Sequence, residues 1–172
     1  MNLDFNLEDI EIFLDISEEI ENESPNQSLK KLLSVQDRID IFKDIDSMEL
    51  KALVYDVEFK KYKFKDYIIK DGEYSENIFF IIKGECHIFK NNKNIAKLSP
   101  GETFGEIGAI FKQERTADVV AANNDTVLLK FKIDEENLEF NARALAILYK
   151  NLAFAISNKL QELNIAYINI KK

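Results

Sequence analysis

The sequence is poor in the residues that build metal centres and covalent catalytic sites. Its 172 residues include one cysteine, Cys86, and one histidine, His87. A single cysteine cannot form an intramolecular disulfide, and a zinc site needs three or four such ligands. A nucleophile paired with a histidine base has only His87 to draw on. We therefore expect no disulfide framework, no metal site and no enzyme of the nucleophile–base type.

The chain also lacks a long hydrophobic run and an excess of positive charge. No apolar stretch approaches the roughly 20 residues of a membrane-spanning helix, and the acidic N-terminus does not resemble a secretory signal. The net charge is −8, and residues 1–29 hold nine acidic residues and no Lys or Arg. The other 143 residues hold 22 acidic and 23 basic residues, without the basic face of a nucleic-acid binder. We expect a cytoplasmic protein that binds neither DNA nor a membrane.

Helical spacing marks the first 54 residues. Apolar residues make up 46% of the chain, with 13 Phe and 6 Tyr, so a buried core is expected. Residues 1–28 are predicted to form an acidic helical arm that ends in a linker at Ser24–Ser28. Residues 29–54 are predicted to form a small helical bundle, with one helix over about 29–42 and another over 46–54. Ser47 is the candidate cap of the second helix.

Between residues 55 and 133 the apolar period changes to two, which is typical of strands. The segments 57–62, 86–90 and 127–131 alternate, whereas Ile78–Ile82 is apolar throughout, as expected of a strand buried on both faces. Turn sequences separate them at short intervals. This pattern predicts a β-sandwich or jelly roll rather than a parallel sheet.

Helical spacing returns in residues 134–172. We expect one long helix or two, with an apolar stripe that covers the β region. The residues of this stripe are Leu138, Leu145, Leu148, Leu152, Ile156, Leu160 and Leu163.

A segment rich in small residues interrupts the β region between residues 104 and 117. Glu106 and Arg115 lie nine positions apart in it, and Gly101, Gly105 and Gly108 are three of the five glycines of the chain. Glycine lets a ligand approach the backbone closely. A short helix that starts near Gly105 would direct backbone N–H groups toward an anion. The pattern is suited to a ribose and its phosphate, with a carboxylate for the sugar hydroxyl and a guanidinium for the phosphate.

The run F-G-E-I-G-A-I-F-K-Q-E-R-T-A-D-V-V resembles the phosphate-binding cassette of the cyclic nucleotide-binding domain family. The upstream segments 67–73 and 78–85 are similar to the strands that precede the cassette in that family, and the resemblance extends from Ile41 to about Leu160. It implies a mainly β fold, a jelly-roll β-roll with N-terminal helices and a long C-terminal helix. It also implies a non-enzymatic regulatory protein that binds cAMP or cGMP and acts on a separate partner.

The resemblance assigns roles to individual residues. Glu106 would accept a hydrogen bond from the ribose 2′-hydroxyl, Arg115 would pair with the cyclic phosphate, and Thr116 could bond the edge of a guanine. The full set of expected ligand-binding residues is Phe104, Gly105, Glu106, Ile107, Gly108, Ala109, Arg115, Thr116 and Ala117. The C-terminal helix would act as a lid over the base and as a candidate homodimer helix, with Tyr149, Leu152, Asn158 and Lys159 as the candidate lid residues.

Two residues depart from the family pattern. Glu114 stands where many members have proline, and Asp118 where a small or hydroxyl residue is usual. Both acids flank Arg115 and could pair with it, so an interaction or scaffold protein that has the fold but binds no nucleotide is the alternative function. A metal-dependent cupin enzyme is the third candidate, but it needs several histidines. No helix-turn-helix pattern is visible before Lys172, so no DNA-binding module is expected.

Overall fold

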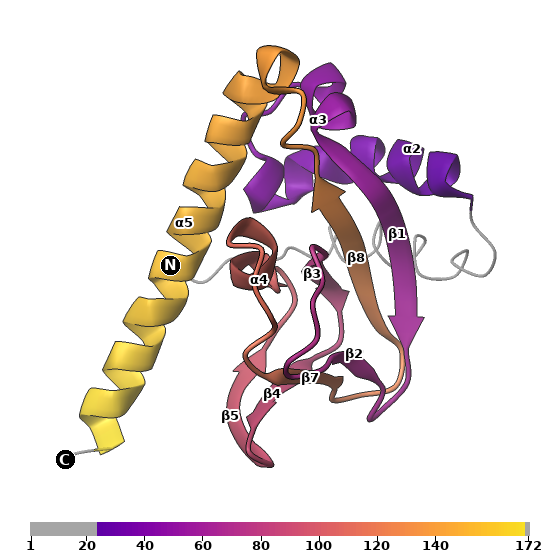
Figure 1. The fold of residues 1–172 in the computed structure, drawn as a ribbon. Coiled ribbons are helices and arrows are strands. Elements are labelled where there is room, and N and C mark those ends of the chain that lie inside the picture. The colour runs from indigo at the N-terminus through magenta and orange to yellow at the C-terminus, as the bar shows by residue number, and fades with distance from the viewer. Residues whose placement is uncertain (1–23, 171–172) are drawn as a thin grey trace.

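Among residues 24–170, which the computed structural model describes, eight strands form two antiparallel four-stranded sheets (Figure 1). The first sheet has the order β1-β8-β3-β6 and the second has the order β2-β7-β4-β5. The strands are β1 (Val54–Tyr62), β2 (Tyr67–Ile69), β3 (Ile78–Lys83), β4 (Cys86–Lys90), β5 (Lys93–Leu98), β6 (Thr103–Phe104), β7 (Asp118–Ala121) and β8 (Thr126–Ile133). This β-sandwich of the jelly-roll type, with helices at both ends, confirms the predicted fold class.

Strand β3 lies between two cores, which explains its uninterrupted apolar run. Its residues Ile78 to Ile82 are all buried, as predicted. Phe80 faces a core that the first sheet shares with the helices, whereas Phe79 and Ile81 face a second core between the two sheets. Because both faces of the strand are covered, alternation with polar residues would have placed polar groups in one of the cores.

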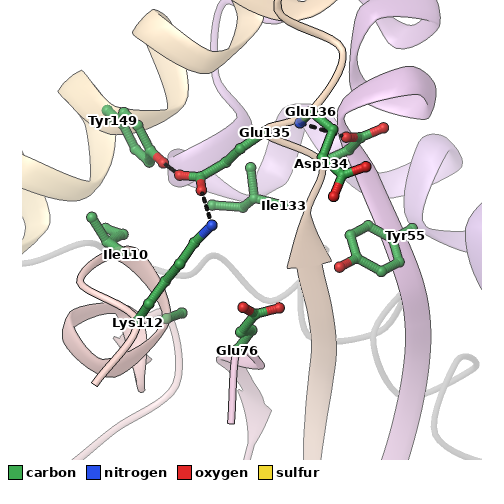
Figure 2. Close-up of a pocket in the computed structure, with 10 residues that line it drawn as sticks. Tyr55, Glu76, Ile110, Lys112, Ile133, Asp134, Glu135, Glu136 and Tyr149 are labelled. Atoms are coloured by element: carbon green, nitrogen blue, oxygen red, sulfur yellow. Dashed lines mark hydrogen bonds and ion pairs between the residues drawn. The ribbon is translucent and has the colours of Figure 1, made fainter. Parts of the chain in front are cut away.

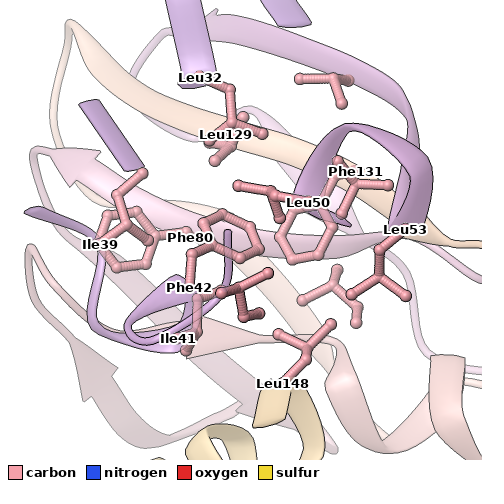
Figure 3. Close-up of a cluster of buried hydrophobic side chains, with 14 of the residues drawn as sticks. Leu32, Ile39, Ile41, Phe42, Leu50, Leu53, Phe80, Leu129, Phe131 and Leu148 are labelled. Atoms are coloured by element: carbon pink, nitrogen blue, oxygen red, sulfur yellow. The ribbon is translucent and has the colours of Figure 1, made fainter. Parts of the chain in front are cut away.

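The core on the helix side holds most of the largest fully buried side chains of the described residues (Figure 3). Phe42 meets Phe131 of β8 edge to face, with ring centroids 5.2 Å apart. Leu148 and Leu152, from the C-terminal helix, close the same core. The core therefore ties the helices before and after the β-roll to one sheet.

The first described helix, α2 (Pro25–Val35), begins within the segment that was predicted to be a linker. Ser24 is its N-cap, and the Gln27 side chain accepts a hydrogen bond from the Ser24 backbone N–H at 2.8 Å. Pro25 suits the first position of a helix because that position has no intrahelical N–H partner to lose. Two short 3₁₀ turns, Gln36–Arg38 and Asp40–Phe42, replace the rest of the helix predicted over 29–42. Most of the predicted acidic arm, residues 1–23, lies outside the described residues.

The next helix, α3 (Ser47–Leu53), is capped by Asp46 and not by Ser47. The Asp46 carboxylate accepts from the Met48 backbone N–H at 2.8 Å. In return, the Asp46 backbone N–H donates to the Glu49 side chain at 3.3 Å. The sequence placed the cap one residue too late because Asp and Ser are both good caps and stand next to each other.

Replacing Asp46 with alanine is expected to lower the free energy of unfolding by about 1 kcal/mol, because the Met48 N–H loses its partner. The measurement is urea denaturation followed by circular dichroism. Asp46→Asn is the matched control, since it keeps the side-chain oxygen and should retain most of the stability. Equal losses in the two variants would show that the charge, and not the cap, carries the effect.

The C-terminal segment forms one continuous helix, α5 (Leu138–Ile170), which decides between the two arrangements predicted for it. The side chain of Asn141 donates to the Ala52 backbone carbonyl at 3.2 Å, and that of Asn151 donates to the Lys43 carbonyl at 2.9 Å. From this anchor α5 runs down one side of the molecule and past the short helix α4 (Glu106–Ile110), as Figure 1 shows. None of the helices within residues 24–170 combines the length and the hydrophobicity of a transmembrane segment.

Candidate functional site

The predicted cassette forms β6, the turn at Gly105 and the helix α4. Phe104 anchors its start, stacked on Phe79 of β3 with ring centroids 5.1 Å apart. Gly105 then takes a left-handed conformation with φ of 82° and caps α4. This conformation is readily adopted by glycine but strained for other residues. The sequence-based expectation of a short helix at Gly105 is therefore confirmed.

Two glycines make room for the side chain of Arg115. A Cβ atom on Gly105 would lie 3.0 Å from Arg115 Nη1, and one on Gly108 would lie 2.9 Å from the same atom. Both distances are shorter than ordinary contacts of a side chain with its neighbours. The sequence had suggested that these glycines serve the approach of a ligand. The structure adds that they let the guanidinium lie against the backbone of α4.

Arg115 is buried, with 5% of its surface exposed, and its guanidinium bonds to main-chain carbonyls. Nη1 donates to the Gly105 carbonyl, and Nη2 donates to the Asn77 carbonyl at 2.6 Å. Its Nε is buried and has no hydrogen-bond partner, and within the described part of the chain no carboxylate forms an ion pair with it. Burial lowers the pKa of Arg115, and the charges of Glu73 and Glu106 partly offset this. The site thus holds a buried cation without a direct counter-ion.

Glu106 supplies the other charge of the site and is equally buried, with 5% of its surface exposed. Lys159 of α5 lies 3.5 Å from its carboxylate. The Lys159 ammonium also donates to the Thr103 carbonyl at the end of the first sheet. The carboxylate predicted to bind a ribose is therefore paired with a cation from the C-terminal helix.

These residues line a cavity of about 360 Å³ between α4, the second sheet and α5. Most of the predicted ligand-binding residues border it, namely Phe104, Gly105, Glu106, Ile107, Gly108, Arg115, Thr116 and Ala117. Ala109 does not border it, because its side chain turns into the core on the helix side. The opposite wall is aliphatic and comes from the second sheet, through Ile69, Ile88, Leu98 and Val119. The cavity thus has a charged end and an apolar end.

Only one of the four candidate lid residues lies at this cavity. Lys159 borders it, whereas Leu152 is buried in the helix-side core and Asn158 is exposed. Tyr149 lies at a different cavity, where its hydroxyl donates to Glu135. Besides Lys159, the α5 side chains that line the cavity are Ile156, Leu160 and Leu163. All three belong to the apolar stripe read from the sequence, but the stripe does not tell which of its turns lies over α4.

The two acids that flank Arg115 do not neutralise it. Asp118 points away, and its carboxylate accepts from the Asp71 backbone N–H at 2.8 Å. Glu114 borders the same cavity, but it is exposed, its backbone bridges to Tyr74 in the neighbouring turn, and its carboxylate forms no ion pair with Arg115. The sequence could not separate these outcomes, because the direction of each side chain depends on the pairing of that turn with the residues around Asp71.

A second cavity, of about 380 Å³, lies at the C-terminal end of α4, where Ala109 and Ile110 border it (Figure 2). Four of its lining residues are acidic, namely Glu76, Asp134, Glu135 and Glu136. Lys112 spans it to reach Glu135 at 3.3 Å. Within residues 24–170, no three or more His, Cys, Asp or Glu side chains are arranged so that they could hold a metal ion. This acidic lining disfavours an anion, so the cavity with the buried arginine is the better anion site.

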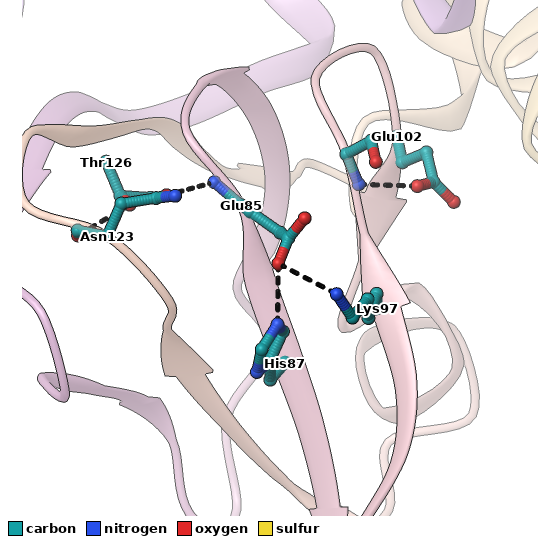
Figure 4. A network of polar contacts seen from close by, with 7 residues as sticks. Glu85, His87, Lys97, Glu102, Asn123 and Thr126 are labelled. Carbon is teal, nitrogen blue, oxygen red and sulfur yellow. Dashed lines mark hydrogen bonds and ion pairs between the residues drawn. The ribbon is translucent and has the colours of Figure 1, made fainter.

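The single histidine and the single cysteine lie away from both cavities. His87 and Glu85 are 2.6 Å apart on the surface of the second sheet, with Lys97 beside them at 3.7 Å from Glu85 (Figure 4). Cys86 is fully buried, and burial raises the pKa of its thiol to about 12. A thiol with such a pKa carries almost no thiolate at neutral pH, so Cys86 has the character of a structural residue.

Comparison with known proteins relates the β-roll to a described domain family. Residues 59–137 match the family model described as "Cyclic nucleotide-binding domain". A cGMP-dependent protein kinase of Plasmodium berghei is 32% identical over 92 residues, which cover 54% of this chain and 11% of the kinase. Human cGMP-dependent protein kinase 2 is 28% identical over 134 residues, which cover 77% of this chain and 18% of the kinase. The chain thus spans less than a fifth of the length of these relatives.

Solved structures agree on the fold. A cyclic nucleotide-binding domain from Methylobacillus flagellatus aligns with a TM-score of 0.64 at 18% identity, over 86% of this chain and 85% of that domain. The catabolite activator protein of Thermus thermophilus aligns with a TM-score of 0.55 at 23% identity, over 77% of this chain and 63% of that protein. These alignments support the β-roll and its flanking helices as one arrangement.

Proposed function

Because this chain contains a cyclic nucleotide-binding domain, as its sequence predicted, we propose that the cavity beside α4 binds a cyclic mononucleotide, cAMP or cGMP. The observation that carries the proposal is the buried guanidinium of Arg115, which has no carboxylate partner. A buried charge without a counter-ion is costly, and a bound anion would offset this cost. A cyclic phosphate is an anion of suitable size that also brings a ribose to the neighbouring carboxylate.

The cavity offers complementary contacts to each part of such a ligand. Arg115 would pair with the phosphate, and the Glu106 carboxylate would accept from the 2′-hydroxyl of the ribose. The base would lie against the aliphatic wall formed by residues such as Ile88 and Val119. Thr116 is exposed at the edge of the cavity, so its hydroxyl is available to a guanine edge without excluding adenine.

The same cavity connects the ligand to the C-terminal helix. Ile156, Leu160 and Leu163 form its α5 wall, so a ligand that fills the cavity changes what this part of α5 can contact. A ligand shifts a conformational equilibrium only if it binds one arrangement better than the other. We propose that α5 has two such arrangements, and that a separate partner protein responds to the difference. In this function the chain is a regulatory protein and not an enzyme.

Binding is tested by isothermal calorimetry and thermal unfolding with cAMP, cGMP and the linear nucleotides AMP and GMP. A cyclic nucleotide at 100 times its dissociation constant is expected to stabilise the protein by about 2.7 kcal/mol. The linear nucleotides serve as controls for the cyclic phosphate and should stabilise much less. The absence of any heat or thermal shift with both cyclic nucleotides at millimolar concentration would contradict the proposal.

One observation favours the alternative, an interaction protein that binds no nucleotide. Both terminal nitrogens of Arg115 already donate to the carbonyls of Gly105 and Asn77, and Lys159 already faces Glu106. The charged end of the cavity is thus partly satisfied by the protein itself. The calorimetric experiment separates the two functions, since the alternative predicts no binding by the wild-type chain.

A further inference from the structure

Lys159 is the one cation of the described residues that forms an ion pair with Glu106. It belongs to α5, more than 50 positions away in the sequence, and it reaches the carboxylate across the cavity. Its ammonium is held by two groups, the Glu106 carboxylate at 3.5 Å and the Thr103 carbonyl. The aliphatic neighbours Ile156 and Leu160 flank it on the same helix face. The contact therefore joins the C-terminal helix to the start of α4.

The position of Lys159 matters because of what Glu106 would otherwise do. A buried carboxylate needs a cation or hydrogen-bond donors to offset its lost hydration. In this structure Lys159 meets that need. In a complex with a cyclic nucleotide, the ribose hydroxyl would donate to the same carboxylate. Only 5% of Glu106 is exposed, so the Lys159 ammonium and a ribose hydroxyl would compete for its carboxylate.

We propose that Lys159 is an affinity-determining residue that occupies the sugar-binding end of the cavity and holds α5 over it. The inference rests on the proposed function for the competition with a nucleotide, but the hold on α5 does not depend on any ligand. Sugar binding at Glu106 displaces the ammonium, and α5 then loses its polar link to Thr103 and Glu106. Ligand affinity and the position of α5 are in this way coupled through one side chain.

The hold on α5 is tested first without nucleotide, by hydrogen exchange of the full chain followed by mass spectrometry. Lys159→Met keeps the length of the side chain and removes its charge. We expect the amides of residues 156–163 to exchange roughly threefold to tenfold faster in this variant, since local opening becomes easier. Lys150→Met, an exposed lysine on the same helix, is the matched control and should exchange as the wild type does. Equal exchange in all three proteins would overturn the inference.

The competition is tested by calorimetric titration of the same three proteins with cAMP and cGMP. If Lys159 competes with the sugar, Lys159→Met binds roughly threefold to tenfold more tightly than the wild type and Lys150→Met. Weaker binding by Lys159→Met would overturn the competition and show that the ammonium contacts the ligand. No binding by any of the three proteins would refute the proposed function and the competition together, while the exchange experiment would still decide the hold on α5.

Discussion

Replacing Arg115 with alanine is expected to weaken the binding of a cyclic nucleotide by roughly 100-fold, because the phosphate loses its buried counter-ion. Among residues 24–170, Arg115 carries the buried positive charge at this end of the cavity. Lys159 is only partly buried. An alanine leaves the phosphate without the guanidinium that would otherwise pair with it. The loss should appear in calorimetric titrations as a higher dissociation constant.

Arg115 also holds the site together, and this second role must be separated from the first. Its side chain joins Gly105 at the start of α4 to Asn77 before β3. Arg115→Lys keeps the charge but cannot form both hydrogen bonds with the geometry of a fork, so it should bind with an intermediate affinity. Urea denaturation of each variant reports whether the fold has been lost instead.

A matched control is available on the same loop. Lys112→Ala removes an exposed cation that pairs with Glu135 at the other cavity, so it should leave the dissociation constant unchanged. If Arg115→Ala bound a cyclic nucleotide with wild-type affinity while Lys112→Ala did too, the phosphate would not lie at Arg115. The assignment of this cavity as the binding site would then be wrong.

The β-roll and the short helix at Gly105 could be predicted because the deciding signals are local. Alternating residues identified the strand 57–62, and the continuous apolar run identified Ile78–Ile82 as a strand covered on both sides. The glycine at position 105 indicated where a short helix begins, as α4 does in the structure. Each of these signals lies within one element, where side-chain period and backbone preference act together.

The contacts that Arg115 and Glu106 make within the site could not be predicted from the sequence. Arg115 bonds to a carbonyl 38 positions upstream, and a main-chain carbonyl carries no sequence signal. Lys159 meets Glu106 only because the packing of α5 sets the rotation of that helix over α4. The same rotation places Leu152 in the core and Ile156 at the cavity. A helical stripe predicts that one face of a helix is buried, but it does not predict which elements that face packs against.

Replacing Leu148 with alanine is expected to lower the free energy of unfolding by about 3 kcal/mol, the middle of the range for a buried leucine. Leu148 is 0% exposed and lies in the core on the helix side, together with Phe80 and Leu53. It thus fixes α5 to the helices and to the first sheet at once. The loss should appear in urea denaturation as a lower midpoint, with the slope of the transition unchanged.

Phe154→Ala is the matched control, because Phe154 lies on the same helix but is 69% exposed. It removes a larger side chain, yet the cost should stay within about 0.5 kcal/mol, since little of its surface leaves water on folding. A loss below about 1 kcal/mol for Leu148→Ala would contradict the packing of α5 described above. In that case the helix would be held mainly by its polar contacts, and the Lys159 ion pair would have to carry more of the link between α5 and the cavity.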